Sequence, residues 1–387
     1  FSFDHVRVAS DGVGRRSVLE HPLQPFSKRY FGADADPRLF SYGDAEAAGA
    51  RALSASERRR RRFHSKPLLG EAAESTTVDE LARFFENPAR ALLERRLGLS
   101  FWDDAVLLSD REPLEISPLE AYELGSALVA RVASGATPEA LVEWARAMGL
   151  VPYGTPGEVD LDDVLADVHA FASVVRRFLR EEPQSAAVDI GLDGSKLVGA
   201  IGGLYAEGRV ALRFARLKPK NEVSSWVRHL AMQFLPDEHP KTTIVGGRAT
   251  QNVNGRVELR FFEPLALHDA RTHLSALMRL YRLGQQAPLC FFPGASKVFA
   301  ERWKKDAEKP HGGPTPLERA RGVFSDSRLL YSEGDDPYVK RLFDGVDPFA
   351  DSPVPFDEDG ALGLPSFGEI ARAIYIPMLD ASRVEAA

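Results

Sequence analysis

The chain has 387 residues, 44% of them hydrophobic, and a formal net charge of −7. These values are typical of a globular protein with one large domain and appendages, and no apolar run is long enough to span a membrane. We expect a cytoplasmic protein, because the first residues lack the features of a signal peptide and the single cysteine, Cys290, excludes an internal disulfide and a cysteine-ligated metal centre.

The first 70 residues predict an arm rather than a compact domain. In the segment HPLQPFSKRYF, residues 21–31, two prolines lie among apolar residues, and each proline biases its predecessor toward an extended conformation. The aromatic residues of this segment would then dock on a surface. Residues 44–63 predict a helix that ends in five consecutive arginines, Arg58 to Arg62. That run is either a solvated helix face or a phosphate contact.

Helix signals become clear beyond residue 70. Thr77 and Glu80 have the spacing of a capping box, in which each side chain accepts a backbone N–H of the other. Asn87 and Pro88 predict the cap and first position of a second helix, and Gly98 predicts its end. Further helices are predicted to begin at Ser117 and Thr137, to run from Leu161 to Arg180 and from Asp269 to Leu283, and to cover residues 367–379.

The hydrophobic period changes to that of strands near residue 186. Residues 186–233 predict three strands followed by a helix, with a tight turn at 206–208. In the third strand Val210, Leu212 and Phe214 alternate with Arg209, Ala211 and Arg213, so we expect a half-buried strand with arginines facing solvent. Two more strands are predicted at 241–245 and 257–262, and loops around short helices at 304–360.

The order strand, strand, strand, helix is the one in which a metal-dependent nuclease holds its active site. Such an enzyme needs carboxylates from adjacent strands that converge on Mg²⁺, and a nearby lysine that stabilises charge on the phosphate. Lys218 is present, but Gly202 and Arg216 stand where the two acids are expected. Val129 stands where related nucleases have a metal-binding histidine. We therefore expect neither catalytic residues nor a metal site.

Positive charge gathers at the end of the third strand and along the following helix. The candidates for contact with DNA phosphates are Arg213, Arg216, Lys218, Lys220 and Arg228. Trp226 is either a platform for base stacking or a core residue of the helix. His229 is either catalytic or, as is more common for a lone histidine, a packing residue. Because the whole chain is acidic, any contact with DNA is local or shared with a partner.

Six segments resemble, in the same order, the C-terminal part of RecC subunits of bacterial exodeoxyribonuclease V, the RecBCD helicase–nuclease. They are HPLQPFSKRYF at 21–31, LARFFENPARALLERRLGL at 81–99, EPLEISPLEAYELG at 112–125, LVGAIGGLY at 197–205, WVRHL at 226–230 and HLSALMRLYRLGQQAPLCFFPGAS at 273–296. We therefore expect an arm at 1–70, linked to a helicase-like portion that this sequence lacks, and a nuclease-like domain at 71–387.

The resemblance implies an α/β fold like that of restriction endonucleases, with helices flanking the core sheet. It also implies that this domain has lost the active residues. It implies RecB-like and RecD-like subunits, double-stranded DNA ends and forked DNA as partners, and no membrane. Mg²⁺ and ATP would act in the partner subunits, so no cofactor is expected in this chain. The implied role is to guide DNA, to help split the duplex and to assemble the subunits during double-strand-break repair by homologous recombination.

Two alternatives remain open. In the first, the chain is an active metal-dependent nuclease whose acids lie elsewhere, with Asp189 and Asp193 acting beside Lys218. In the second, it is a protein-interaction module that never touches DNA, which the acidic net charge favours. Neither the element that splits the duplex nor a role for the arginine run follows from the sequence, and recognition of a Chi sequence would belong to the family's helicase-like part.

Overall fold

The computed structural model describes residues 21–31, 38–39, 41–54, 63, 66–70, 75–101, 115–133, 135–179, 181–249, 257–309, 312–326, 332–350 and 362–386. The chain forms two compact units, Phe1–Arg61 and Arg62–Ala387. The boundary near residue 70 between an arm and a nuclease-like domain stays a prediction. The arginine run at 58–62 lies outside the described residues.

The first unit contains two helices. One turn of helix, α2 (Lys28–Phe31), lies in the segment that was expected to be extended, and α3 (Asp44–Ser54) lies where the sequence predicts a helix. Gly49 of α3 faces Phe26, since a Cβ at this glycine would be 3.5 Å from the Phe26 Cβ. His21 Nδ1 lies 3.1 Å from the Tyr30 hydroxyl. The aromatic segment therefore packs in part on its own unit.

The second unit begins with a short strand and two capped helices. They are β1 (Ser75–Thr77), α4 (Val78–Glu86) and α5 (Pro88–Ala91), and α5 continues into a π-helical turn, η2 (Leu92–Arg96). The capping box of Thr77 and Glu80 is confirmed, because Glu80 N donates to Thr77 Oγ1 at 3.1 Å and Thr77 N donates to Glu80 Oε2 at 3.0 Å. Asn87 caps α5, and Gly98 takes a positive φ of 63° just beyond these helices.

The predicted order of three strands and a helix is confirmed. The elements are β2 (Gln184–Leu192), β3 (Ser195–Tyr205), β4 (Gly208–Arg216) and α9 (Pro219–Met232), followed by β5 (Thr243–Arg248), β6 (Val257–Phe262) and β7 (Ser382–Ala386). The described strands form one sheet in the order β1-β3-β4-β5-β6-β7, with β2 paired to β3. β4 and β5 are parallel, with α9 as the crossover, whereas β2–β3 and β5–β6–β7 are antiparallel.

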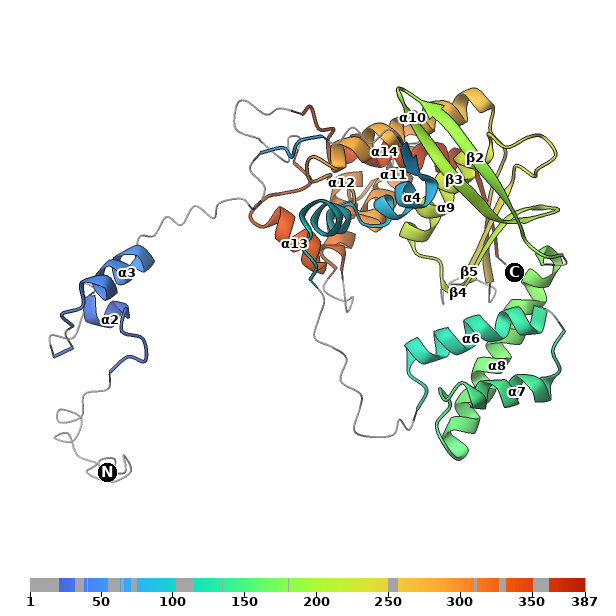
Figure 1. The fold of residues 1–387 in the computed structure, drawn as a ribbon, viewed down its shortest axis with the longest axis horizontal. Helices are drawn as coiled ribbons and strands as arrows, with labels where there is room; N and C mark the ends of the chain where they lie inside the picture. The colour runs from blue at the N-terminus through green and yellow to red at the C-terminus, as the bar shows by residue number, and fades with distance from the viewer. Residues whose placement is uncertain are drawn as a thin grey trace. The chain divides into compact units, whose positions relative to one another are not determined.

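Helices cover this sheet in two groups (Figure 1). One group packs around the buried side chains of α9 and contains α4, α10 (Leu267–Gly284), α11 (Pro293–Glu308) and α14 (Phe367–Asp380). The other group is α6 (Pro118–Ala133), α7 (Pro138–Ala147) and α8 (Thr155–Val175), which share a second core with β4, β5 and β6. The mixed sheet with flanking helices confirms an α/β fold.

A third core lies where the sequence predicts loops around short helices. The helices are α12 (Pro316–Phe324) and α13 (Pro337–Phe343), with a 3₁₀ turn at Glu333–Asp335. They enclose a cluster of aromatic rings centred on Phe292, whose ring centroid is 4.6 Å from that of Phe324 and 5.6 Å from that of Phe343. The composition of this region is polar, but its phenylalanines pack with Phe292, Phe299 and Phe367 from outside it to form a core.

Candidate nucleic-acid interface

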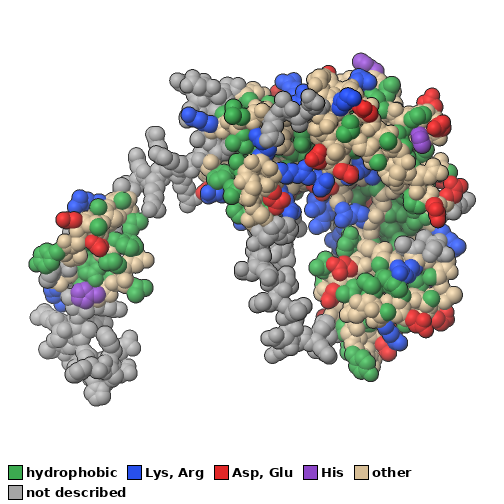
Figure 2. Space-filling view, in the orientation of Figure 1, with side chains coloured by type: hydrophobic (Ala, Val, Ile, Leu, Met, Phe, Trp, Pro, Cys, Tyr) green, Lys and Arg blue, Asp and Glu red, His purple; other side chains and the backbone are tan. Residues whose placement is uncertain are grey.

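Four basic side chains lie at the end of β4 and the start of α9. We call Arg213, Arg216, Lys218 and Lys220 the basic strip; all four are exposed. Figure 2 shows Lys and Arg side chains gathered below α9, next to the helices α6–α8. The sequence predicted these four residues, together with Arg228 and Trp226, as DNA-contact candidates; the four adjoin the junction of β4 and α9.

A bulge in β4 positions the strip. Leu212 pairs with Gly246 and Arg216 with Arg248, so β4 advances four residues while β5 advances two. The extra residues force the backbones together, since a Cβ at Gly247 would lie 2.7 Å from the Ala215 carbonyl oxygen. Bulges bend a strand and redirect its side chains, and they are common beside functional sites. The bulge therefore sets the direction in which the end of β4 presents its arginines.

Members of the strip differ in how they are held. Arg213 Nη2 donates to the Tyr122 hydroxyl of α6 at 3.4 Å, and this hydrogen bond lowers the pKa of Tyr122. By contrast, Arg216, Lys218 and Lys220 form no hydrogen bond or ion pair through their side chains with any described residue. Lys220 is close enough to Glu333 to interact with its charge. Arg216 and Lys218, as exposed cations without such a contact among the described residues, are available to phosphates at little cost in desolvation.

The N-terminus of α9 adds positive potential to the same place. Lys218 is the N-cap, with φ −91° and ψ 148°, and no side chain caps the helix; Pro219 occupies the first turn. The first N–H groups of a helix point outward and carry the positive end of the helix dipole. Pro219 has no N–H, and the N–H groups of Asn221 and Glu222 donate to the Lys218 carbonyl oxygen. An anion beside Lys218 and Lys220 would therefore be favoured by their side chains and by the helix dipole.

A buried charge network anchors this end of α9. Glu222, in the first turn, is 1% exposed, and its Oε1 accepts a hydrogen bond from Lys297 Nζ of α11 at 2.8 Å and lies 3.5 Å from Arg260 Nε of β6. Because a buried carboxylate needs partners, this network fixes α9 relative to both neighbours. Sequence reasoning missed it, since the three residues are far apart in the chain and only the fold joins them.

Two of the candidate DNA contacts, Trp226 and Arg228, interact with other residues of this chain. Trp226 is 1% exposed and stacks on His229 with ring centroids 5.3 Å apart. No base can stack on it in this structure, so Trp226 is a core residue of the helix. Arg228 Nη2 lies 2.7 Å from Asp79 Oδ1, and its Nη1 donates to the Ser224 carbonyl at 2.9 Å. Trp226 is buried in the core and Arg228 is a partly exposed residue held by α4, whereas the strip ends at Lys220, at the beginning of α9.

His229 is a packing residue in the described structure. It is fully buried, with Nδ1 3.1 Å from Thr243 Oγ1 and Nε2 3.1 Å from the Glu263 carbonyl oxygen. Burial lowers the pKa of His229 to about 3, so the ring is neutral at physiological pH. A histidine held between two protein groups and closed to solvent has no free nitrogen for catalysis.

Gly202 and Arg216, the positions of the expected acids, do not converge. Gly202 lies two residues before Leu204, which pairs with Arg209, whereas Arg216 lies seven residues beyond Arg209. At about 3.3 Å per residue, and allowing for the bulge, the two positions are separated by roughly 10–16 Å along the sheet. Val129 is buried in the core of the α6–α8 group, in the middle of α6 rather than at a helix start.

The alternative acids are also separated from Lys218. Asp189 lies on β2, with β3 between it and β4, and its Oδ2 is 3.2 Å from Lys196 Nζ. Asp193 lies in the β2–β3 turn with φ 43°. Across the described residues, no three His, Cys, Asp or Glu side chains lie close enough together to hold a metal ion.

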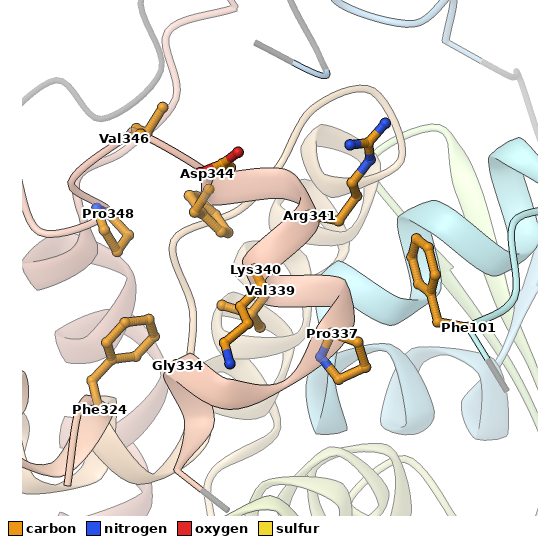
Figure 3. Close-up of a pocket in the computed structure, with 12 residues that line it drawn as sticks. Phe101, Phe324, Gly334, Pro337, Val339, Lys340, Arg341, Asp344, Val346 and Pro348 are labelled. Atoms are coloured by element: carbon orange, nitrogen blue, oxygen red, sulfur yellow. The ribbon is translucent and has the colours of Figure 1, made fainter. Parts of the chain in front are cut away.

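A cavity of about 590 Å³ lies beside α13 (Figure 3). Its lining includes Phe101, Phe324 and Pro337, and two basic residues of α13. Those cations already have partners: Lys340 Nζ lies 2.8 Å from Asp335 Oδ1, and the Arg341 guanidinium lies 4.3 Å from the Phe63 ring centroid. In Figure 3, Arg341 points away from Lys340 and Phe324. The cavity therefore gathers no set of groups suited to chemistry.

Comparisons with known proteins agree with the arrangement of this domain. Residues 73–303 match the family model of the RecC C-terminal domain. The chain is 27% identical over 326 residues to the RecBCD enzyme subunit RecC of Mycolicibacterium smegmatis, and 24% identical over 322 residues to that of Escherichia coli. These alignments cover 82% and 81% of this chain and 28% of each relative.

The chain thus spans little more than a quarter of the length of these relatives. Among the described helices, none is both long and apolar enough to cross a bilayer. The family match extends from just before β1 into α11 and so contains the sheet strands β1 to β6, both ends of α9 and the whole basic strip. The chain therefore belongs to the RecC C-terminal domain family.

Proposed function

We propose that this chain is a non-catalytic DNA-guiding and scaffolding domain of a RecBCD-type helicase–nuclease, and that it contributes to duplex splitting and subunit assembly in double-strand-break repair. The observation that carries the DNA role is the basic strip at the uncapped N-terminus of α9. Three of its cations have no ion pair within the described chain. Both relatives are named as RecBCD enzyme subunits, which supports the assembly role.

A degenerate restriction-endonuclease-like core is part of this proposal. The order β2, β3, β4, α9, β5, with an antiparallel meander followed by a helical crossover to a parallel strand, supports it. Gly202 and Arg216 in place of carboxylates, and their separation along the sheet, support the loss of metal chemistry. Mg²⁺ and ATP would then act in RecB-like and RecD-like partner subunits, and DNA ends and forks would pass over the strip.

The DNA role is tested by binding of fluorescent forked DNA at a series of salt concentrations. The variant Arg216→Ala/Lys218→Ala/Lys220→Ala should bind the fork at least tenfold more weakly than the parent. Its slope of log K against log salt should be less steep, by roughly 0.9 for each duplex phosphate contact that is lost. Equal affinity and equal slope would place any DNA contact elsewhere.

The matched control removes three exposed cations far along the chain, with the variant Lys305→Ala/Lys309→Ala/Arg319→Ala. It has the same net charge as the strip variant, so general electrostatic attraction is lowered equally. A fork affinity close to the parent's is expected. If both variants weaken binding to the same degree, the effect belongs to net charge and not to the strip.

The loss of catalysis is tested by incubating forked DNA with Mg²⁺ or Mn²⁺ and the purified chain. No cleavage is expected. Cleavage that disappears in Lys218→Ala, or in Asp189→Ala, would instead indicate an active nuclease with displaced acids. Folding of each variant is checked by circular dichroism, so that a missing activity is not a missing fold.

A pure interaction module is the second candidate, and one observation favours it. Residues 115–179, which carry α6–α8, contain ten Asp and Glu and four Lys and Arg, so most of the net charge of −7 lies in this helical group. An acidic surface repels DNA and suits a basic protein partner. Undetectable affinity for forked DNA at low salt, together with intact assembly into the complex, would establish this candidate.

A further inference from the structure

The sheet opens on one edge of β3. This strand pairs with β4 only through Leu204↔Arg209 and Tyr205↔Gly208, and with β1 only through residues 196–198. Gly199 and Gly203, in the stretch between, have positive φ values of 138° and 73°. Arg209 of β4 pairs with Leu204 at the end of this opening, and its charge interacts with those of Arg228 on α9 and Asp79 on α4. The sequence predicted a solvent-facing position for Arg209.

Arg209 was expected to face solvent and is instead buried. It is 9% exposed, and its Nε and Nη1 are closed to solvent without a hydrogen-bond partner. No described residue accepts a hydrogen bond from its guanidinium. Burial, and then the nearby charge of Arg228, lower its pKa to about 10, which leaves it protonated at neutral pH. Buried polar groups are nearly always paired, so a protonated guanidinium without an acceptor requires an explanation.

The surroundings of Arg209 hold more positive than negative charge. Arg228 is close enough to depress its pKa, and Asp79 of α4 is the carboxylate that opposes this effect. Asp79 itself is bound to Arg228, at 2.7 Å between Oδ1 and Nη2. His229 adds no charge, because its pKa is lowered to about 3. One carboxylate thus lies near two guanidinium groups.

Asp79 is the most exposed of these three charged residues. Its side chain is 60% exposed and that of Arg228 is 21% exposed, whereas Arg209 is 9% exposed. Asp79 is also in the first turn of α4, where the helix dipole favours negative charge. An anion that arrives here would meet a carboxylate already in place on Arg228.

We infer that Arg209 and Arg228 form a binding site for one oxyanion of the phosphate class, for which the Asp79 carboxylate competes. Guanidinium groups bind phosphate oxygens through paired N–H donors, which suits a single tetrahedral anion between two arginines. The inference stands apart from the proposed DNA role, because the site is formed by Arg209 at the start of β4 and Arg228 in the second half of α9, and not by the strip. Its phosphate comes from free solution or from a nucleic-acid backbone.

The test is thermal unfolding of the purified chain in sodium phosphate, compared with sodium chloride at equal ionic strength. Phosphate should raise the Tm of the parent by roughly 3–6 °C at about 100 times its Kd. The variant Arg209→Met should lose this rise, yet be no less stable in chloride, because it removes a buried charge without a partner. A parent Tm that is the same in both salts overturns the inference, whatever the variants do.

Two further variants sharpen the result. Asp79→Asn removes the competing carboxylate and should tighten phosphate binding roughly 2- to 5-fold, the effect of losing one partly exposed ion pair. Arg319→Met removes an exposed arginine of α12 and should keep the parent's phosphate response. If Arg209→Met keeps the response, or Asp79→Asn weakens it, the site is not the one inferred.

A titration with duplex DNA distinguishes free phosphate from a backbone phosphate as the ligand of this site. Duplex DNA is titrated into the parent and into Arg209→Met, both with the strip intact. A weaker DNA affinity of the variant assigns the site to a backbone phosphate, and an equal affinity assigns it to free phosphate. The change of Tm in phosphate is measured without DNA. It therefore tests this site even if the strip fails to bind a fork, so failure of one proposal can be told from failure of the other.

Discussion

Gly125 of α6 lies directly against the ring of Phe214 of β4: a Cβ at Gly125 would be 2.1 Å from Phe214 Cε1. The helix and the strand touch through a glycine because any larger residue would displace the ring. Phe214 also packs edge-on against Phe171 of α8, at 5.7 Å between ring centroids. This contact joins the α6–α8 group to the sheet beside the basic strip.

The variant Gly125→Ala should therefore destabilise the domain. The Cβ has to push a buried ring out of its rotamer or move α6, and overpacking of this kind costs about 1–3 kcal/mol. Urea denaturation followed by circular dichroism measures the loss. The control is Gly322→Ala in α12, where a Cβ meets nothing within 4 Å and alanine should stabilise the helix by up to about 1 kcal/mol. Equal effects of the two changes would contradict the close contact.

Glu222→Gln should destabilise the chain more strongly. The change leaves Lys297 and Arg260 without the carboxylate that lies 2.8 Å and 3.5 Å from them, and breaking a buried ion pair costs about 3–5 kcal/mol. Glu301→Gln is the matched control, since its carboxylate is 40% exposed and 4.0 Å from the same lysine. That control should cost less than about 1 kcal/mol. Similar values for both variants in chemical denaturation would show that the buried network is not an anchor.

The stability of the chain should fall as the pH is lowered from neutral, and His229 should carry part of the fall. Its pKa is lowered to about 3 in the folded state by burial, whereas an unfolded histidine titrates near 6.5. Below pH 6.5 the unfolded state binds the extra proton, so stability is full above that pH and declines toward pH 3. The expected loss from this group is about 2 kcal/mol at pH 5.

Comparing the parent with His229→Gln isolates that contribution. Other groups, such as the buried Glu333 whose pKa is raised, titrate equally in both proteins and cancel in the difference. The variant should lose about 2 kcal/mol less between pH 7 and pH 5 than the parent does. His268→Gln, which changes an exposed histidine of α10, should follow the parent. Parallel curves for the parent and His229→Gln would rule out a neutral buried ring.

Local signals in the sequence predicted much of this fold, because they depend on neighbours in the chain. The capping box of Thr77 and the turn at 206–208 are examples. Some boundaries were missed: α8 begins at Thr155 instead of Leu161. In its first turn Gly157 lies against the Pro152 carbonyl, and a Cβ there would lie 1.9 Å from the oxygen. The short strands β1 and β7 were also missed, since each depends on a distant partner strand.

The candidate site was predicted in part for the same reason. Lys218 and Lys220 adjoin the β4–α9 junction in sequence, so their grouping follows from the chain itself. Arg209 alternates with apolar residues and was expected outside, but α9 covers that face of the sheet near the opening beside β3. A period of two shows which residues share a face, and it cannot show that both faces are covered by helices.

Trp226 and Arg216 should separate stability from DNA binding. Trp226→Phe leaves a gap beside His229 and Phe262 in the core, so the free energy of unfolding should fall by about 1–3 kcal/mol. Its affinity for forked DNA should match the parent's, because the indole is closed to solvent. Arg216→Met should weaken binding of forked DNA and leave the free energy of unfolding nearly unchanged, since an exposed side chain without an ion pair in the described chain contributes little to folding. Fluorescence anisotropy and urea denaturation on the same preparations measure both quantities, and weaker fork binding by a folded Trp226→Phe would show that the indole does reach DNA.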